Sequence, residues 1–118
     1  MQEVKTDDFT ASRETAPALV VVQTTLDDAA AARRLAAALV EARLAACAQC
    51  RAVHSVYRWK GGVETANEEL VQVKTTADKA AAVRSFIAKR HPYELPEIAW
   101  YRIDATPAYV AWVREAVS

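Results

Sequence analysis

The feature that most constrains this chain is a pair of adjacent glycines, Gly61 and Gly62, which are the only glycines in its 118 residues. A Gly-Gly pair supplies the positive φ angles that a tight hairpin turn needs. Residues 51–59 before the pair and 63–75 after it alternate in the manner of β-strands. One face of the first segment is expected to carry Val53, Ser55, Tyr57 and Trp59. The sequence therefore predicts a long central hairpin, with strands of about ten residues spanning roughly 34 Å, whereas typical strands have about five or six residues.

The segments on either side of the hairpin predict the remaining elements. A continuous apolar run at residues 18–22 is typical of a buried strand, and the alanine-rich segment from about 27 to 44 favours a helix. A second helix, which Pro92 stops near residue 90, and a strand at 97–103 follow the hairpin. The order strand, helix, strand, strand, helix, strand predicts an α+β ferredoxin-like βαββαβ sandwich, in which helices cover one face of an antiparallel sheet.

Paired hydroxyl and carboxyl side chains predict where the helices begin. The segments Thr25–Asp28 and Thr75–Asp78 each match the capping-box pattern. Thr106-Pro107 indicates an N-cap followed by proline at the first helical position, and so an additional C-terminal helix. The first helix is expected to turn one apolar stripe toward the core, formed by Leu35, Leu39 and Val40.

Composition narrows the classes of protein. Fifteen basic and fifteen acidic residues give a net charge of zero, so there is no electrostatic reason to expect nucleic-acid binding. No apolar run approaches the roughly 20 residues that a membrane span needs. Residues 1–16 show neither periodicity nor the apolar core of a secretory signal, so we expect a flexible tail before a single domain at 17–118. With only two cysteines, we expect reduced thiols and a cytoplasmic location.

The outer half of the hairpin predicts self-association. It carries Tyr57, Trp59 and Val63, which would be costly to leave in water. Open strand edges also invite pairing with another chain, and a closed symmetric ring protects every edge. We therefore expect these three residues at an interface between copies of the chain; a solvated, mobile arm is the alternative.

Five segments carry a resemblance to a known family. They are Leu44–Ala48, Tyr57–Gly61, Val73–Thr76, His91–Glu97 and Tyr109–Trp112. In this order and spacing, over about residues 18–116, they resemble the CutA divalent-cation-tolerance family. The resemblance implies a PII-like protomer, assembled as a tight homotrimer through the long hairpins. It also implies a loose association with copper and other divalent metals, known from a tolerance phenotype rather than from a reaction.

The resemblance places His91 at a metal-contacting position in a cleft between protomers. Neutral imidazole suits Cu(II), Zn(II) and Ni(II). Some copper-binding relatives have a cysteine where this chain has Gln23, and a second histidine where it has Arg90. Because neither replacement is a good ligand for a soft metal, we expect a weak divalent metal site. The alternative is that His91 caps the C-terminus of its helix.

Other residues are candidates for lining the same cleft. Glu94 and Glu97 resemble the carboxylates that the family has beside it, and Lys74 could bind an anion or form an ion pair. The complete expected set beside the metal ligand is Gln23, Lys74, Arg90, Tyr93, Glu94 and Glu97. Cys47 and Cys50 lack the second Cys-x-x-Cys pair of a zinc ribbon and point to opposite faces of a strand, so we expect Cys47 to be a buried small residue and Cys50 an incidental thiol.

No pattern in the sequence indicates catalysis. There is no nucleophile with a recognisable base, no phosphate-binding loop and no dinucleotide fingerprint. We therefore expect a homotrimeric, non-enzymatic protein that binds divalent metal and responds to it. The alternative is a PII-like signalling protein or scaffold whose clefts hold a small anionic molecule or a partner protein. A hydrolase using Glu94 and Glu97 is the least favoured interpretation.

Overall fold

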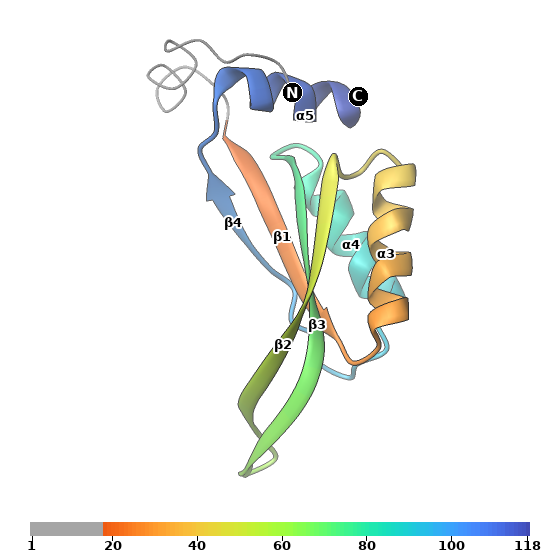
Figure 1. Cartoon of the computed structure of the whole chain (residues 1–118), viewed down its shortest axis with the longest axis vertical. Coiled ribbons are helices and arrows are strands. Elements are labelled where there is room, and N and C mark those ends of the chain that lie inside the picture. The colour runs from red at the N-terminus through yellow and green to blue at the C-terminus, as the bar shows by residue number, and fades with distance from the viewer. Residues whose placement is uncertain (1–17) are drawn as a thin grey trace.

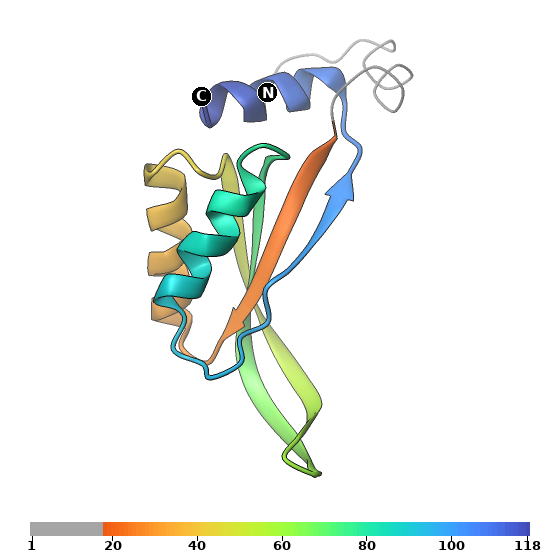
Figure 2. The ribbon, with the colours of Figure 1, turned by 180° about the vertical axis from the view of Figure 1, so that it is seen from behind.

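Four antiparallel strands and three helices make up residues 18–118, the part of the chain that the computed structural model describes. The predicted tail at 1–16 lies outside the described residues. The elements are β1 (Leu19–Leu26), α3 (Ala29–Glu41), β2 (Cys47–Trp59), β3 (Gly62–Thr76), α4 (Ala80–Arg90), β4 (Ala99–Ile103) and α5 (Pro107–Ala116). The sheet order is β2-β3-β1-β4, with α3 and α4 on one face and α5 across the end away from the hairpin tip (Figures 1 and 2). The predicted ferredoxin-like α+β fold with an extra C-terminal helix is confirmed.

The main core lies between α3, α4 and one face of the sheet. Side chains of β1 and β3 that point to this face pack against those of the helices, including the fully buried Val22, Val71, Val73, Leu39, Val83 and Ile87. The predicted stripe of α3 is right for Leu35 and Leu39 but wrong for Val40, which is 40% exposed. Val40 follows Leu39 by one residue, a rotation of about 100° around the helix axis, so it points out of the core.

A smaller cluster closes the end of the sheet under α5. Leu19 of β1 packs there against Val110 and Val113. The opposite face of the sheet, here called the open face, is not covered by α3 or α4. Because side chains alternate along a strand, the open face receives every second residue of the hairpin, among them Ser55, Tyr57 and Glu68.

The predicted capping box at the start of α3 is wrong. Thr25 still belongs to β1, where it pairs with Leu70 of β3. Asp28 is itself the N-cap, and its carboxylate accepts hydrogen bonds from the backbone N–H groups of Ala30 at 2.9 Å and Ala31 at 3.3 Å. Strand pairing therefore holds Thr25 out of the cap, and the helix begins later than the pattern indicated.

Of the other two predicted helix starts, one is wrong and one is confirmed. The predicted box Thr75–Asp78 is wrong, because Thr75 lies in β3 and α4 begins after Lys79 without a side-chain cap. The predicted cap of α5 is confirmed: the Thr106 hydroxyl accepts a hydrogen bond from the backbone N–H of Tyr109 at 3.3 Å.

The hairpin extends well beyond the four-stranded sheet. β1 pairs with β3 only at residues 69–76, so residues 62–68 of β3 pair with β2 alone. This two-stranded ribbon projects from the body of the molecule, whose extents are 51 × 27 × 24 Å (Figure 1). The predicted long hairpin is confirmed, and β2 begins four positions before the expected 51.

The hairpin turn differs from the expected Gly-Gly turn. Trp59 pairs with Gly62, which leaves Lys60 and Gly61 as the two loop residues. Their φ angles are 49° and 82°, as a type I′ turn requires, while Gly62 has no positive φ and belongs to β3. Only Gly61 of the pair therefore supplies the glycine backbone that the turn needs.

Candidate functional site

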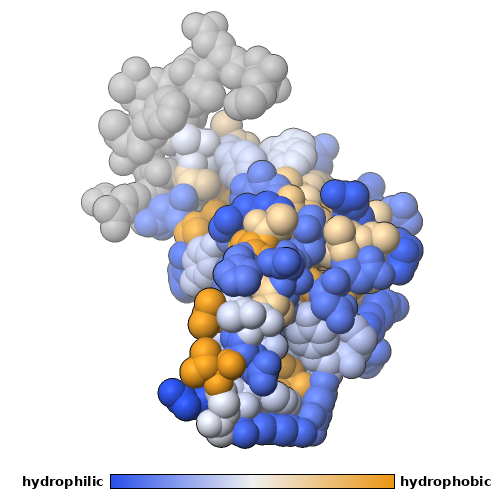
Figure 3. All heavy atoms as spheres, turned by 60° about the horizontal axis from the view of Figure 1, so that its bottom comes forward, coloured by the Kyte–Doolittle hydropathy of each residue, from blue (hydrophilic) through white to orange (hydrophobic). Residues whose placement is uncertain are grey.

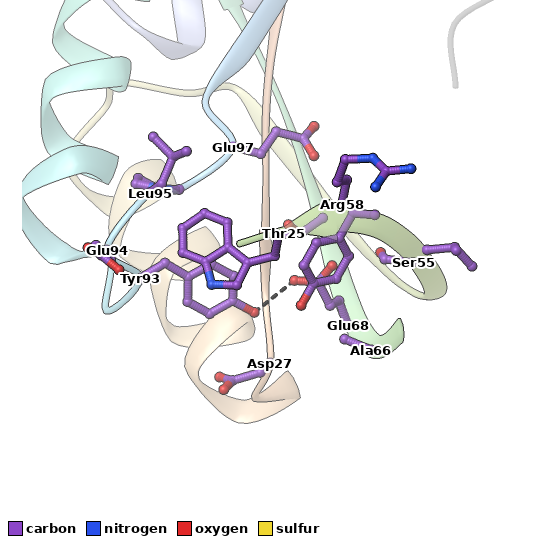
Figure 4. A pocket seen from close by; sticks show the side chains of 14 residues that line it. Thr25, Asp27, Ser55, Arg58, Ala66, Glu68, Tyr93, Glu94, Leu95 and Glu97 are labelled. Atoms are coloured by element: carbon purple, nitrogen blue, oxygen red, sulfur yellow. Dashed lines mark hydrogen bonds between the residues drawn. The ribbon is translucent and has the colours of Figure 1, made fainter. Parts of the chain in front are cut away.

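A groove of about 800 Å³ lies where the hairpin leaves the sheet (Figure 4). The hairpin forms one wall, with Ser55–Trp59 of β2 and with Ala66 and Glu68 of β3. The segment Tyr93–Glu97, which leads from α4 to β4, forms the other wall. Thr25 and Asp27 contribute from the end of β1. The groove thus joins residues from four parts of the chain that are distant in sequence.

A hydrogen bond connects the two walls. The Tyr93 hydroxyl donates to the Glu68 carboxylate at 2.8 Å, and Figure 4 shows the two side chains pointing toward one another. Burial of the Glu68 carboxyl by itself would raise its pKa. Hydrogen bonds from the hydroxyls of Ser55, Tyr93 and Thr25 outweigh this effect. The net pKa of Glu68 is therefore lowered from its usual 4.5, so the carboxylate is ionised at neutral pH.

The phenol of Tyr93 is affected in the opposite direction. Burial raises its pKa, and the hydrogen bond to the Glu68 carboxylate raises it further. Tyr93 therefore keeps its proton and acts as a donor, never as a phenolate.

Both ring nitrogens of His91 are hydrogen-bonded to the backbone. Nδ1 lies 3.2 Å from the backbone nitrogen of Tyr93, whose N–H can only donate, so Nδ1 accepts. Nε2 then carries the proton and donates to the Thr25 carbonyl oxygen at 2.9 Å. The ring also meets the Tyr93 ring edge-on, with centroids 4.7 Å apart. A metal ion binding to His91 would have to replace one of these two hydrogen bonds.

Gln23 holds a carboxylate beside the groove. Its Nε2 donates to Glu97 at 2.9 Å, and its Oε1 lies 3.4 Å from the Gln72 amide nitrogen. Gln72 also donates to the Tyr101 hydroxyl at 3.2 Å. These four side chains form a polar network on the open face, and the network orients Glu97.

Three of the expected cleft residues, Gln23, Lys74 and Arg90, do not line the groove, and neither does His91. Lys74 lies farther along the sheet, where it pairs with Val21 and Cys47. The Arg90 guanidinium lies 3.5 Å from the ring centroid of Phe86 and donates to the carbonyl of the same residue at 3.2 Å. The structure thus brings Tyr93, Glu94 and Glu97 together, puts Gln23 next to them, and leaves the two cations of the expected set elsewhere.

The three hairpin residues expected at an interface are all exposed. Val63 is 65% exposed, Tyr57 44% and Trp59 36%, and Val56 on the same ribbon is 64% exposed. Figure 3, which brings the hairpin end of the molecule forward, shows hydrophobic residues at this surface among hydrophilic ones. Tyr57 and Trp59 also line the groove.

The lining of the groove is acidic. Its described lining residues include four carboxylates and one guanidinium, which give a formal net charge of three negative charges. The carboxylates belong to Asp27, Glu68, Glu94 and Glu97, and the guanidinium belongs to Arg58. Within residues 18–118, however, no three histidine, cysteine, aspartate or glutamate side chains converge closely enough to hold a metal ion. The described side chains of a single protomer therefore do not form a complete metal site.

The two cysteines lie apart from the groove. Cys50 packs against the main core beneath the helices, and burial raises the pKa of its thiol. Cys47 is three residues away on the same strand, so it points to the open face. Both cysteines are half-buried, so Cys47 is less buried than expected, and Cys50 contributes to the packing of the core.

Sequence reasoning missed Glu68, Asp27, Thr25 and Arg58 as groove residues. Glu68 could have been found, because a hairpin register counted from the turn puts it on the face of Ser55 and Tyr57. For Asp27 and Thr25 the sequence holds no such signal, since they reach the groove only through the packing of β1 against the other segments.

The described helices leave no candidate for a membrane span: none within residues 18–118 is both long and apolar enough.

Comparisons with known proteins agree on one family. The model of the family described as CutA1 divalent ion tolerance protein matches residues 20–116. The divalent-cation tolerance protein CutA of Thermus thermophilus is 39% identical over 97 residues, which cover 80% of this chain and 94% of that protein. Protein CutA of Mus musculus is 35% identical over 85 residues, or 70% of this chain, and the chain spans about half of that relative's length (48%).

Solved structures of CutA proteins have the same fold. CutA from Synechococcus elongatus PCC7942 gives a TM-score of 0.85 at 36% identity, covering 94% of this chain and 99% of that one. A structure of the same protein complexed with a Bis-Tris molecule gives a TM-score of 0.78 at 34% identity, covering 85% and 94% of the two chains. The match over nearly all described residues, in sequence and in fold, shows that this chain belongs to the CutA1 divalent ion tolerance family.

Proposed function

We propose that this chain assembles into a homotrimer that binds divalent metal cations weakly at clefts between protomers, and that it catalyses no reaction. The observation that carries the proposal is the acidic groove at the base of the hairpin, with four carboxylates against one guanidinium. Membership of a divalent ion tolerance family gives the role in which such a site would act.

The homotrimer is supported by surfaces that one chain leaves uncovered. The ribbon exposes Tyr57, Trp59 and Val63, and β2 and β4 are the outer strands of the sheet that residues 18–118 form. Burying such side chains and pairing such edges favours a closed ring of identical chains. Sedimentation or light scattering should give three times the 12.9 kDa mass of the chain. A monomer at micromolar concentration would overturn this part of the proposal.

Weak binding follows from the ligands that one protomer offers. Oxygen ligands such as Glu94 and Glu97 suit hard ions like Mg²⁺ and Mn²⁺, whereas an imidazole is needed to favour Cu(II). His91 becomes available only by giving up its hydrogen bond to Tyr93 or to Thr25. Ligands from a neighbouring protomer would have to complete the coordination. We therefore expect Cu(II) to bind weakly, with His91 as its nitrogen ligand.

The test is a calorimetric titration of Cu(II) and Mn(II) into the whole chain and its variants. His54→Ala is the matched control for His91→Ala, because the chain has two histidines and His54 lies on the hairpin, bonded to Asn67 at 2.9 Å. We expect Cu(II) binding to be saturable, lost in His91→Ala and kept in His54→Ala. Equal heats of Cu(II) binding in both variants would mean that His91 is not a ligand of the metal. Absence of saturable binding for both metals would overturn metal binding itself.

A second candidate function is that of a PII-like sensor that binds a small molecule. The groove has a suitable volume of about 800 Å³ and aromatic lining, and a relative with 34% identity was solved with a Bis-Tris molecule. An anionic ligand, as the sequence led us to expect, fits poorly with four carboxylates. Lys74 and Arg90, the cations expected to attract it, lie outside the groove.

A further inference from the structure

Three aromatic side chains line the acidic groove. Tyr57 and Trp59 come from alternate positions of β2, and Tyr93 comes from the opposite wall. In a single chain Tyr57 and Trp59 are 44% and 36% exposed, and both line the groove. The Lys60 ammonium nitrogen lies 5.7 Å from the Trp59 ring centroid, a cation–π distance, so this ring already attracts a cationic nitrogen of the chain itself, which a ligand bound on the same face would displace.

Four carboxylates line the groove together with these rings. They belong to Asp27, Glu68, Glu94 and Glu97 (Figure 4), and Arg58 is the single cation among the described lining residues. Glu68 is fixed in position, because the Tyr93 hydroxyl donates to it at 2.8 Å. A ligand in the groove therefore meets aromatic faces and negative charge together.

This combination also suits a second class of cation. A small hard dication dehydrates reluctantly and needs several converging oxygen ligands, which the described residues of one protomer do not bring together. It gains little from an aromatic face that it reaches only through its water shell. An alkylated ammonium ion is larger and has apolar groups that pack on rings, while its charge is attracted both to ring faces and to carboxylates. A volume of about 800 Å³ also exceeds what a single metal ion needs and lies in the range of small-molecule sites.

We propose that this groove binds a small organic ammonium ion, whose alkyl groups contact the rings of Tyr57 and Trp59 and whose charge is balanced by Glu68 and the neighbouring carboxylates. The proposal rests on the second candidate function, small-molecule binding, and gives the chemical class of the ligand. It does not depend on metal binding.

The first experiment compares two ligands that differ in charge alone. Choline is titrated calorimetrically into the whole chain beside neohexyl alcohol, in which a carbon atom replaces the cationic nitrogen. We expect saturable binding of choline at one site per chain and binding of the alcohol at least about ten-fold weaker, because only the cation interacts with ring faces and carboxylates. Equal binding of both compounds, or binding of neither, overturns the proposal.

Variants then locate the site. Trp59→Leu removes a ring of the groove, and Trp112→Leu removes an exposed ring on α5 outside it. We expect choline affinity to fall about ten-fold in Trp59→Leu and to be unchanged in Trp112→Leu. Unchanged affinity in a Trp59→Leu protein that assembles like the wild type refutes the site.

A charge variant decides the matter if Trp59→Leu alters assembly. The double variant Asp27→Asn, Glu94→Gln changes two exposed side chains of the groove, and Glu41→Gln is its control on α3. The double variant should weaken choline binding several-fold and the control should not; equal affinities refute the proposal.

Mn(II) titrated into the same samples separates the two proposals, because metal binding without choline binding refutes this inference and leaves the metal function standing.

Discussion

Replacing Tyr93 by phenylalanine keeps the aromatic ring and removes only the hydroxyl that donates to Glu68 over 2.8 Å. A hydrogen bond to a charged group contributes about 1.5–3 kcal/mol to stability. Both side chains are only partly buried and the groove is open to water, which can replace the phenol. We therefore halve the figure and expect Tyr93→Phe to lower the free energy of unfolding by about 1 kcal/mol at neutral pH.

A double-mutant cycle with Glu68→Gln tests whether the loss comes from this contact. The two substitutions should be non-additive by about 1 kcal/mol, because either one removes the same charge-assisted hydrogen bond. Tyr101→Phe is the matched control, since its hydroxyl accepts from a neutral amide of Gln72 on an exposed surface. It should cost less than about 0.5 kcal/mol and show no coupling with Glu68.

The dependence on pH has a definite sign. The pKa of Glu68 is lower in the folded chain than its usual 4.5, so the native state favours the carboxylate. Its contribution to stability is present above 4.5 and is lost as the pH falls through the folded pKa. The coupling energy between Tyr93 and Glu68 should then fall to about half, since a neutral hydrogen bond remains.

The assay is urea unfolding followed by circular dichroism, at one fixed protein concentration because assembly would contribute to apparent stability. The reasoning fails if Tyr93→Phe changes the free energy of unfolding by less than about 0.3 kcal/mol, or if the coupling is the same at neutral and acid pH.

Three further tests of the fold use the same urea assay. Ile87→Ala opens a cavity at a fully buried site and should lower the free energy of unfolding by about 2–5 kcal/mol. Val40→Ala, at a site that is 40% exposed, should lower it by less than about 1 kcal/mol, and similar losses for the two variants would contradict the assigned core. Gly61→Ala puts a side chain at φ 82° and should destabilise the fold by about 1–2 kcal/mol. Gly62→Ala should have almost no effect, because the nearest atom to its added Cβ is 3.9 Å away. The reverse order of the two losses would contradict the turn geometry. Asp28→Ala removes the cap of α3 and should cost about 1 kcal/mol; no loss would mean that the cap is not needed.

Much of the site could be placed from the sequence because its signals are local. The alternation around the glycine pair located both hairpin strands, and Pro92 located the end of α4 and the start of the loop that carries Tyr93, Glu94 and Glu97. These patterns depend on a period of two or 3.6 residues, and neighbouring residues determine them.

The contacts that shape the site were not predictable in the same way. Glu68 and Tyr93 are 25 positions apart, and His91 bonds the carbonyl of Thr25 across 66 positions. A residue pattern does not record which distant partner a side chain will meet. For the same reason, the pattern that made Thr25 look like a helix cap could not reveal that strand pairing with Leu70 would hold it in β1.

The sequence by itself determined the order of the elements, the long ribbon and the family, since periodicity, turn chemistry and short motifs are written in consecutive residues. Only the tertiary structure decided the character of the groove: it put Asp27 and Glu68 beside the expected Glu94 and Glu97, and it left the cation Lys74 outside. The physical reason is that the net charge of a site depends on which side chains packing brings together. One charged residue more or less in the groove changes the ligand that the groove favours.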